Sequence, residues 1–129
     1  MQFVCLVYLE ETTFEHMSDE EKRQVDRDAL AHDAGLAQSG HLIRANALRP
    51  VDTAVTVRVR DGRMSVTDGP FAETKEHLGG FVLVEASDMD EAIRLAANIP
   101  LARLGSIEVR PIMTIGEWDT KPPASGGPG

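Results

Sequence analysis

Residues 68 to 81 read Asp-Gly-Pro-Phe-Ala-Glu-Thr-Lys-Glu-His-Leu-Gly-Gly-Phe and join an expected hairpin to an apolar strand. The start, Asp68-Gly69-Pro70, predicts a sharp turn, because proline fixes its own φ and biases the residue before it away from helix. Four ionisable side chains follow within five positions, and two glycines then lead into the apolar run 81–84. Charges in loops are usually solvated. We therefore expect either a solvated connection or a loop that lines a cleft.

Within this loop, the residue types suggest different roles. A carboxylate at the start of a turn can accept backbone N–H groups, so we expect Asp68 to hold the turn. We expect the ring of Phe71 to be buried against the sheet, whereas the charges behind it contribute little to stability and could line a cleft. The candidate ligand-binding residues are Asp68, Gly69, Pro70, Phe71, Glu73 and Lys75.

The composition indicates one compact domain. The chain has 129 residues, of which 42% are hydrophobic and 26% charged, and this length can bury a substantial core. Its formal net charge of -8, with scattered basic residues, argues against nucleic acid or an anionic membrane as a partner. We expect the domain to span 1–116 and the Pro-, Gly- and Ser-rich residues 117–129 to form a flexible tail.

The first residues and the single cysteine indicate the compartment. Cys5 lies inside an apolar run and has no second cysteine to pair with, so we expect a buried free thiol. No apolar segment approaches the roughly 20 residues that span a bilayer, and no basic segment precedes the first apolar run. A cytoplasmic location is the expectation.

The first half of the chain predicts a strand, a long helix and a second strand. Residues 2–9 are apolar and rich in β-formers. Ser18 and Glu21 have the spacing of a capping box, which predicts a helix from about Asp19 to Gln38. Residues 41–48 read as the next strand. The inward stripe of the helix contains Val25, Ala29, His32 and Leu36.

The second half begins with an expected hairpin. Residues 54–60 alternate apolar and polar side chains, and Asp61-Gly62 suits a tight turn into a returning strand, 64–67. A strand over 80–86 and a helix ending at Ala97 follow, the helix with an inward face of Met89, Ala92, Ile93 and Ala96, and then a last strand over 107–113.

This order of elements predicts the fold class. It is α+β, a ferredoxin-like βαββαβ arrangement with an inserted β-hairpin, which places both helices on one face of an antiparallel sheet. The strands 2–8 and 81–84 are apolar on both sides, so the face without helices also needs a cover. A second copy supplies one most economically, and we therefore expect a homodimer through that sheet face.

The motif Asp68-Gly-Pro-Phe, together with Gly79-Gly-Phe and the stretch 105–111, resembles the YCII-related (YciI-like) proteins of the DGPF-domain type. The resemblance extends over roughly residues 2–113. It implies a dimeric α/β barrel of ferredoxin-like subunits, in agreement with the order of elements.

The same resemblance implies two kinds of function. A better-studied branch of the superfamily is associated with a His and Asp pair, whose positions fall here at Ala29 and Ile99, and one relative eliminates chloride from a chlorinated hydroxyquinol. Other relatives are similar to proteins linked to extracytoplasmic-function sigma factors. That link implies an accessory or ligand-sensing role with a sigma-factor-linked partner.

The residues themselves leave binding and catalysis open. The four histidines show no metal-binding spacing, and no glycine-rich phosphate loop follows a strand, so we expect neither a metal nor a cofactor. One hypothesis is a small-molecule-binding or accessory, signalling module. The alternative is a small acid–base enzyme, lyase- or dehydrochlorinase-like, acting on a small polar or aromatic substrate with His32 and Asp68 as catalytic residues. His32 could equally be a core histidine satisfied by one partner.

Overall fold

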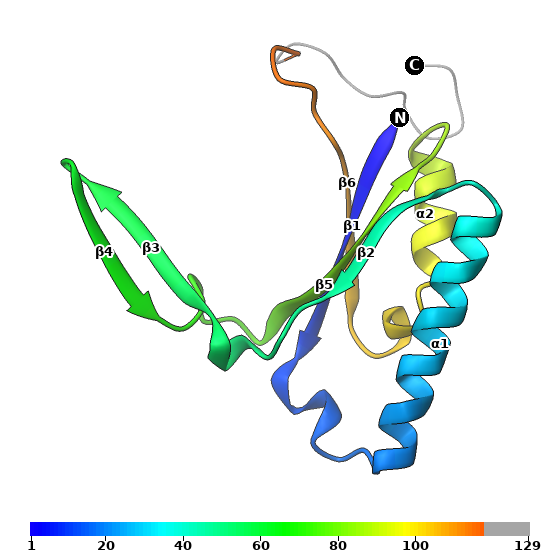
Figure 1. Cartoon of the computed structure of the whole chain (residues 1–129), viewed down its shortest axis with the longest axis horizontal. Helices are drawn as coiled ribbons and strands as arrows, with labels where there is room; N and C mark the ends of the chain where they lie inside the picture. The colour runs from blue at the N-terminus through cyan, green and yellow to red at the C-terminus, as the bar shows by residue number, and fades with distance from the viewer. Residues whose placement is uncertain (118–129) are drawn as a thin grey trace.

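The computed structural model describes residues 1–117 (Figure 1). A four-stranded antiparallel sheet has the strand order β2-β5-β1-β6, and helices α1 and α2 lie together on one side of it. The fold class is therefore α+β with two helices and antiparallel sheets, as expected. The sheet strands are β1 (Gln2–Glu10), β2 (Leu42–Ala47), β5 (Glu76–Glu85) and β6 (Ser106–Pro111); the helices are α1 (Asp19–Gln38) and α2 (Met89–Ala97). Short 3-10 turns span Glu11–Phe14, Val51–Thr53 and Pro100–Arg103.

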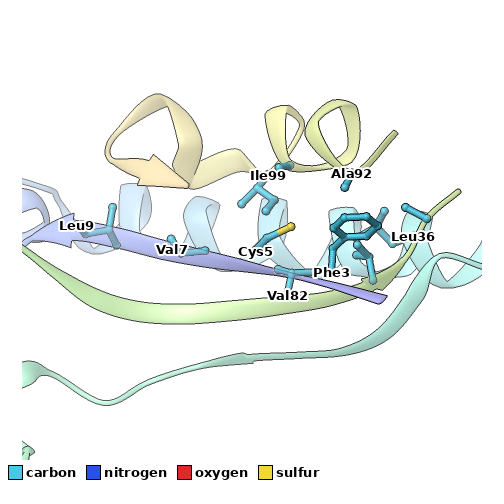
Figure 2. Packing of buried hydrophobic residues seen from close by; sticks show 11 residues of the cluster. Phe3, Cys5, Val7, Leu9, Leu36, Val82, Ala92 and Ile99 are labelled. Carbon is cyan, nitrogen blue, oxygen red and sulfur yellow. The ribbon is translucent and has the colours of Figure 1, made fainter. Parts of the chain in front are cut away.

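The hydrophobic core lies between the sheet and the helices. Alternate residues of β1 point into it, and Figure 2 shows them facing Ala92 of α2 and Ile99 after it. Phe3, Cys5 and Val84 are almost completely buried. Burying each large apolar side chain stabilises the fold by roughly 1.5–3 kcal/mol, so this layer supplies most of the stability. The buried cluster is Phe3, Cys5, Val7, Leu9, Leu36, Val82, Val84, Ala86, Ala92, Ala96 and Ile99.

Helix α1 begins where the capping box predicts. The Ser18 hydroxyl accepts a hydrogen bond from the Glu21 backbone N–H, and the Glu21 carboxylate accepts one from the Ser18 backbone N–H. The hydrogen bond from the Ser18 backbone N–H, together with the nearby Ser18 side chain, stabilises the charged Glu21 carboxylate and lowers its pKa. At the other end, Gly40 has φ 83°, a left-handed conformation that glycine adopts without strain. The predicted bounds of this helix are confirmed.

Strands β3 (Val55–Arg60) and β4 (Arg63–Asp68) form a separate two-stranded antiparallel sheet. The turn between them is Asp61-Gly62, and both residues have positive φ, as the Asp-Gly pair predicts. We call residues 55–68 the arm, because they extend away from the four-stranded sheet on the side opposite α1 and α2 (Figure 1). Residues 55–60 form a strand, as the alternation predicts, but nothing within residues 1–117 covers the apolar face of the arm, so its valines are exposed instead of half-buried.

Strand β5 is longer than the sequence predicts. It begins at Glu76 instead of residue 80, and a bulge lets it continue: Val7 pairs with Gly80, but the next residue, Tyr8, pairs with Leu78. Gly79 is thus an extra residue on β5. The loop between the arm and β5 shrinks to residues 69–75, and Glu76 becomes part of the sheet.

Two further predictions can be compared with the structure. Helix α2 buries Ala92 and Ala96, but Ile93 is 48% exposed and the side chain of Leu95 packs on the core instead. Helix α2 is only nine residues long and its buried residues are two alanines, so only a narrow strip of its surface contacts the core and Ile93 lies outside it. The expected tail lies outside the described residues, apart from Glu117.

Candidate functional site

The four-stranded sheet has a second face, which carries no helix. Side chains alternate along a strand, so the residues between the core positions of β1 point to this side. Cross-strand pairing places Leu6 opposite Phe81 and Val4 opposite Leu83, which gives this face an apolar centre. We call it the open face. Its members are Val4, Leu6, Tyr8 and Glu10 on β1, Arg44 and Asn46 on β2, Glu76, Leu78, Phe81 and Leu83 on β5, and Ser106, Glu108 and Arg110 on β6.

A hollow of about 910 Å³, open to solvent, lies on the open face where β1 ends and where β5 and β6 begin. The adjoining loop supplies part of its wall. Its lining combines one phenol, two hydroxyls, one amine and three carboxylates in a space of the size that small-molecule sites occupy. The lining residues are Tyr8, Glu10, Thr74, Lys75, Glu76, Ser106, Ile107 and Glu108.

The three carboxylates come from three different strands. Glu10 pairs directly with Glu76, and like charges opposite each other on neighbouring strands destabilise a sheet. The compensation is partial. The Lys75 ammonium lies 3.5 Å from a Glu10 oxygen, and the Ser106 hydroxyl donates a 2.8 Å hydrogen bond to a Glu76 oxygen. Glu108 adds a third carboxylate to the lining, and the Arg110 guanidinium lies 3.7 Å from one of its oxygens.

Tyr8 lies at the centre of this arrangement. It pairs with Leu78 on one side and with Ser106 on the other, and its side chain is half-buried on the open face. An aromatic ring beside carboxylates offers a flat apolar surface and a polar tip to a ligand. It can also attract a cation through the face of the ring.

The turn at the end of the arm is held differently from our prediction. Asp68 pairs with Val55 as the last residue of β4, and within residues 1–117 its carboxylate accepts no hydrogen bond. Backbone groups of the neighbouring residue take over that role. The Gly69 N–H donates to the Ala54 carbonyl at 2.8 Å, and the Thr56 hydroxyl donates to the Gly69 carbonyl at 2.9 Å. Gly69 itself has φ 103°.

Phe71 was expected to be buried, and this prediction is wrong. Its side chain is 75% exposed, and its ring lies 5.2 Å from the Arg58 guanidinium of the arm. The loop leaves the end of β4, so the ring lies beside Arg58 of β3 and not on the four-stranded sheet. Phe71 instead makes a cation–π contact at the base of the arm.

Of the remaining loop candidates, the structure brings Lys75 to the hollow together with its neighbour Thr74. Glu73 is exposed and does not line it, and Pro70 and Gly69 lie at the base of the arm, half-buried.

The two catalytic candidates lie in different parts of the molecule. His32 belongs to α1, in the helical layer, and Asp68 ends the arm, on the other side of the sheet (Figure 1). The His32 side chain is 12% exposed, and its Nε2 is buried without a hydrogen-bond partner in the described part of the chain. Its Nδ1 lies 3.8 Å from an oxygen of the adjacent Asp33. One subunit therefore does not join His32 and Asp68 in a common site.

The positions implied by the superfamily's His and Asp pair also lie in the helical layer. Ala29 is half-buried on α1, and Ile99, 5% exposed, belongs to the core cluster. Neither side chain can transfer a proton, so those two positions carry no acid–base chemistry here.

Six residues of the hollow were missed from the sequence: Tyr8, Glu10, Thr74, Ser106, Ile107 and Glu108. The signal available was alternation, since Tyr8 and Glu10 have opposite parity to Cys5 along the first strand. What alternation cannot provide is register, which brings Ser106 beside Tyr8.

Two further properties concern the described residues as a whole. Between residues 1 and 117, no group of three or more His, Cys, Asp or Glu side chains is placed to hold a metal ion. No helix in the same span is both long and apolar enough to cross a membrane.

The fold and the hollow define a small α+β domain with one covered and one open sheet face. Residues 1–119 match the family model of the YCII-related domain, and the chain belongs to this family. It is similar to the uncharacterized protein R00369 of Rhizobium meliloti (strain 1021), with 39% identity over 114 residues. That alignment covers 87% of this chain and 92% of the relative.

Proposed function

We propose that this YCII-related protein binds a small organic cation in the hollow of the open face. The observation that carries the proposal is the direct pairing of Glu10 with Glu76 at an open site, with only one lysine for compensation. A ligand ammonium or guanidinium would relieve that repulsion. Tyr8 would contact an apolar or aromatic part of the same ligand.

Binding without turnover is better supported than acid–base catalysis. The catalytic alternative relies on His32 and Asp68, which lie in the helical layer and at the end of the arm. A ligand-sensing or accessory role in the cytoplasm, of the kind implied for sigma-factor-linked relatives, agrees with a binding site that presents carboxylates and hydroxyls.

The test uses two probes with the same phenol ring and opposite charges, tyramine and 4-hydroxyphenylacetate. In an NMR titration of the ¹⁵N-labelled chain, tyramine should shift the amide signals around Tyr8, Glu76 and Ser106, and the anion should not. Glu10→Gln and Glu76→Gln should each weaken tyramine binding about two- to fivefold, because each removes one exposed charge partner.

Glu73→Gln is the matched control, because that carboxylate is exposed on the same loop but does not line the hollow. It should leave tyramine binding unchanged. Equal shifts with the anion, or equal weakening by all three substitutions, would refute a cation site at this position.

We also propose that the subunit is ferredoxin-like and that two copies pair through their open faces as a dimeric α/β barrel. The support is the apolar centre of that face, where Leu6 meets Phe81 and Val4 meets Leu83 without a covering element within residues 1–117. Pairing two such faces would bury apolar surface on both copies and enclose the hollow between them.

Light scattering coupled to gel filtration should give a mass of about 28 kDa, twice the 14.0 kDa of one chain. Leu6→Asp should give a folded monomer, since Leu6 lies on the open face and its replacement leaves the core intact. A wild-type mass of one chain at micromolar concentration would refute the pairing.

A further inference from the structure

Beyond its base and the contact of Phe71 with Arg58, the arm has no support from the rest of residues 1–117. Within residues 1–117, β3 and β4 pair only with each other, and Figure 1 shows them extending away from the sheet. An isolated two-stranded hairpin is marginally stable at best in water. An arm that keeps all six cross-strand pairs therefore needs a surface to pack against.

One face of the arm is largely apolar, and nothing within residues 1–117 covers it. Pairing of Val57 with Val66 and of Val59 with Met64 puts these side chains on the same face, and the next pair along this face adds Val55 beside Asp68 at the base. The five apolar side chains are between 54% and 70% exposed. The opposite face is polar. The apolar face consists of Val55, Val57, Val59, Met64 and Val66; the polar face presents Thr56, Arg58, Arg60, Arg63, Ser65 and Thr67.

The position of the arm indicates what covers this face. The arm leaves the sheet on the side of the open face, so anything that packs on the open face lies in the angle between sheet and arm (Figure 1). Six-residue strands extend about 20 Å, whereas two packed sheets lie about 10 Å apart. An arm of this length would therefore reach past the facing sheet of a second copy.

The chemistry of the two faces favours an apolar partner surface. The three arginines of the arm lie on its polar face, opposite the apolar one. A nucleic acid would engage the arginines but leave the five apolar side chains uncovered. The apolar centre of a second copy's open face would cover them.

We propose that the arm of each copy packs its apolar face against the second copy, so that two exchanged arms clasp the dimer. This inference builds on the pairing of open faces proposed above. In a two-fold dimer both arms make the same contact, so the apolar faces of both arms are covered. The arm is then an element that folds fully only in the assembled protein.

A direct test detects the arm of one copy on the other. An unlabelled chain with Met64→Cys carries a nitroxide at the apolar face and is mixed with ¹⁵N-labelled wild-type chain. Cys5 does not interfere, because it is buried and its pKa is raised to about 11. Amide signals of the ¹⁵N-labelled copy should broaden at one contiguous surface away from its own arm base.

The outcomes separate the two proposals. A monomer under these conditions refutes the pairing of open faces and the clasp together. A dimer without broadening in the ¹⁵N-labelled copy refutes the clasp alone. A dimer with broadening supports it.

A second measurement uses substitutions that keep the hairpin. The triple change Val57→Thr, Met64→Gln and Val66→Thr retains strand-compatible side chains and removes the apolar face. We expect the dissociation constant of the dimer, from sedimentation equilibrium, to rise at least about tenfold. The control, Ser65→Thr with Thr67→Val, changes the polar face of β4 and should leave it within about twofold. Equal constants for both variants would overturn the proposal.

Discussion

The side of the sheet that faces the helices and the apolar face of the arm show the same alternation of apolar side chains. Both place valines at every second position, yet Val84 is 1% exposed and Val57 is 58% exposed. The difference lies in what covers them. Two helices follow β1 and β5 in the chain and fold back onto one face, whereas no helix follows β3 or β4 directly. Alternation therefore shows which side chains of a strand lie on the same face, but it does not show which element packs on that face.

The largest expected difference comes from replacing one phenylalanine by alanine in the core and one in the loop beside the arm. Phe3→Ala should lower the free energy of unfolding by about 3–5 kcal/mol, because Phe3 is completely buried and a cavity remains. Phe71→Ala should cost less than about 1 kcal/mol, since it loses only an exposed cation–π contact with Arg58. Denaturant unfolding of the two variants measures both values. Similar losses would mean that the loop packs more tightly than the structure shows.

Two glycines should give a smaller difference in stability between the sheet and the arm. A Cβ on Gly105 would lie 2.1 Å from the Tyr8 carbonyl oxygen, so Gly105→Ala should push β6 away from β1 and cost about 1–3 kcal/mol or more. Gly62 at the tip of the arm has φ 73° and open space around it. Gly62→Ala should cost about 1 kcal/mol from backbone strain alone. Thermal denaturation separates the two, and the larger loss for Gly62→Ala would contradict this ranking.

Removal of single hydrogen bonds should show whether the arm unfolds independently of the four-stranded sheet. Ser18→Ala removes the helix cap and should lower global stability by about 1 kcal/mol. Thr56→Val removes the bond to the Gly69 carbonyl at the base of the arm. We expect it to accelerate amide hydrogen exchange within residues 55–68 and to leave exchange in the four-stranded sheet unchanged. Accelerated exchange throughout the chain would show that arm and sheet unfold as one unit.

The smallest effect concerns the pH dependence of stability. Burial raises the pKa of the Cys5 thiol from its ordinary value of 9.0 to about 11. Between these values the unfolded chain loses the proton and the folded chain keeps it, so stability falls as pH rises from 9 to 11. Relative to Cys5→Ala, the wild type should lose stability over that window in urea titrations. A thiol introduced by Ser65→Cys, on the exposed polar face of the arm, should add no such dependence.

The sequence predicts the local elements of this fold well, because their signals are local. The capping box at Ser18 fixes the start of α1, and Asp61-Gly62 supplies the two positive φ values of the tight turn. The start of β5 at Glu76 could not be predicted, because a bulge opposite β1 allows charged residues before Gly79 to continue the strand.

The candidate site was predicted only in part, since it depends on register and on distant strands. Lys75 lines the hollow, whereas Phe71 is exposed and Asp68 accepts no hydrogen bond in the described chain. Tyr8 and Ser106 are almost a hundred positions apart and meet only because β1 pairs with β6. His32 has the inward position that periodicity predicts, yet its layer is separated from Asp68 by the sheet.

The extra glycine in β5 has a consequence for how this family can change in length. Gly79 is absorbed as a bulge, so Glu76 and Leu78 lie on the open face although their parity relative to Val82 would assign them to the core. Gly79 has no partner on β1, so its loss would leave the pairing of the neighbouring residues unchanged. A relative without this glycine would therefore keep Glu76, His77 and Leu78 on the faces of the sheet that they occupy here. Loss of one residue at this point thus keeps the lining of the hollow in place. A one-residue insertion or deletion at a paired position of β5 would instead move Glu76 from the open face to the core side of the sheet.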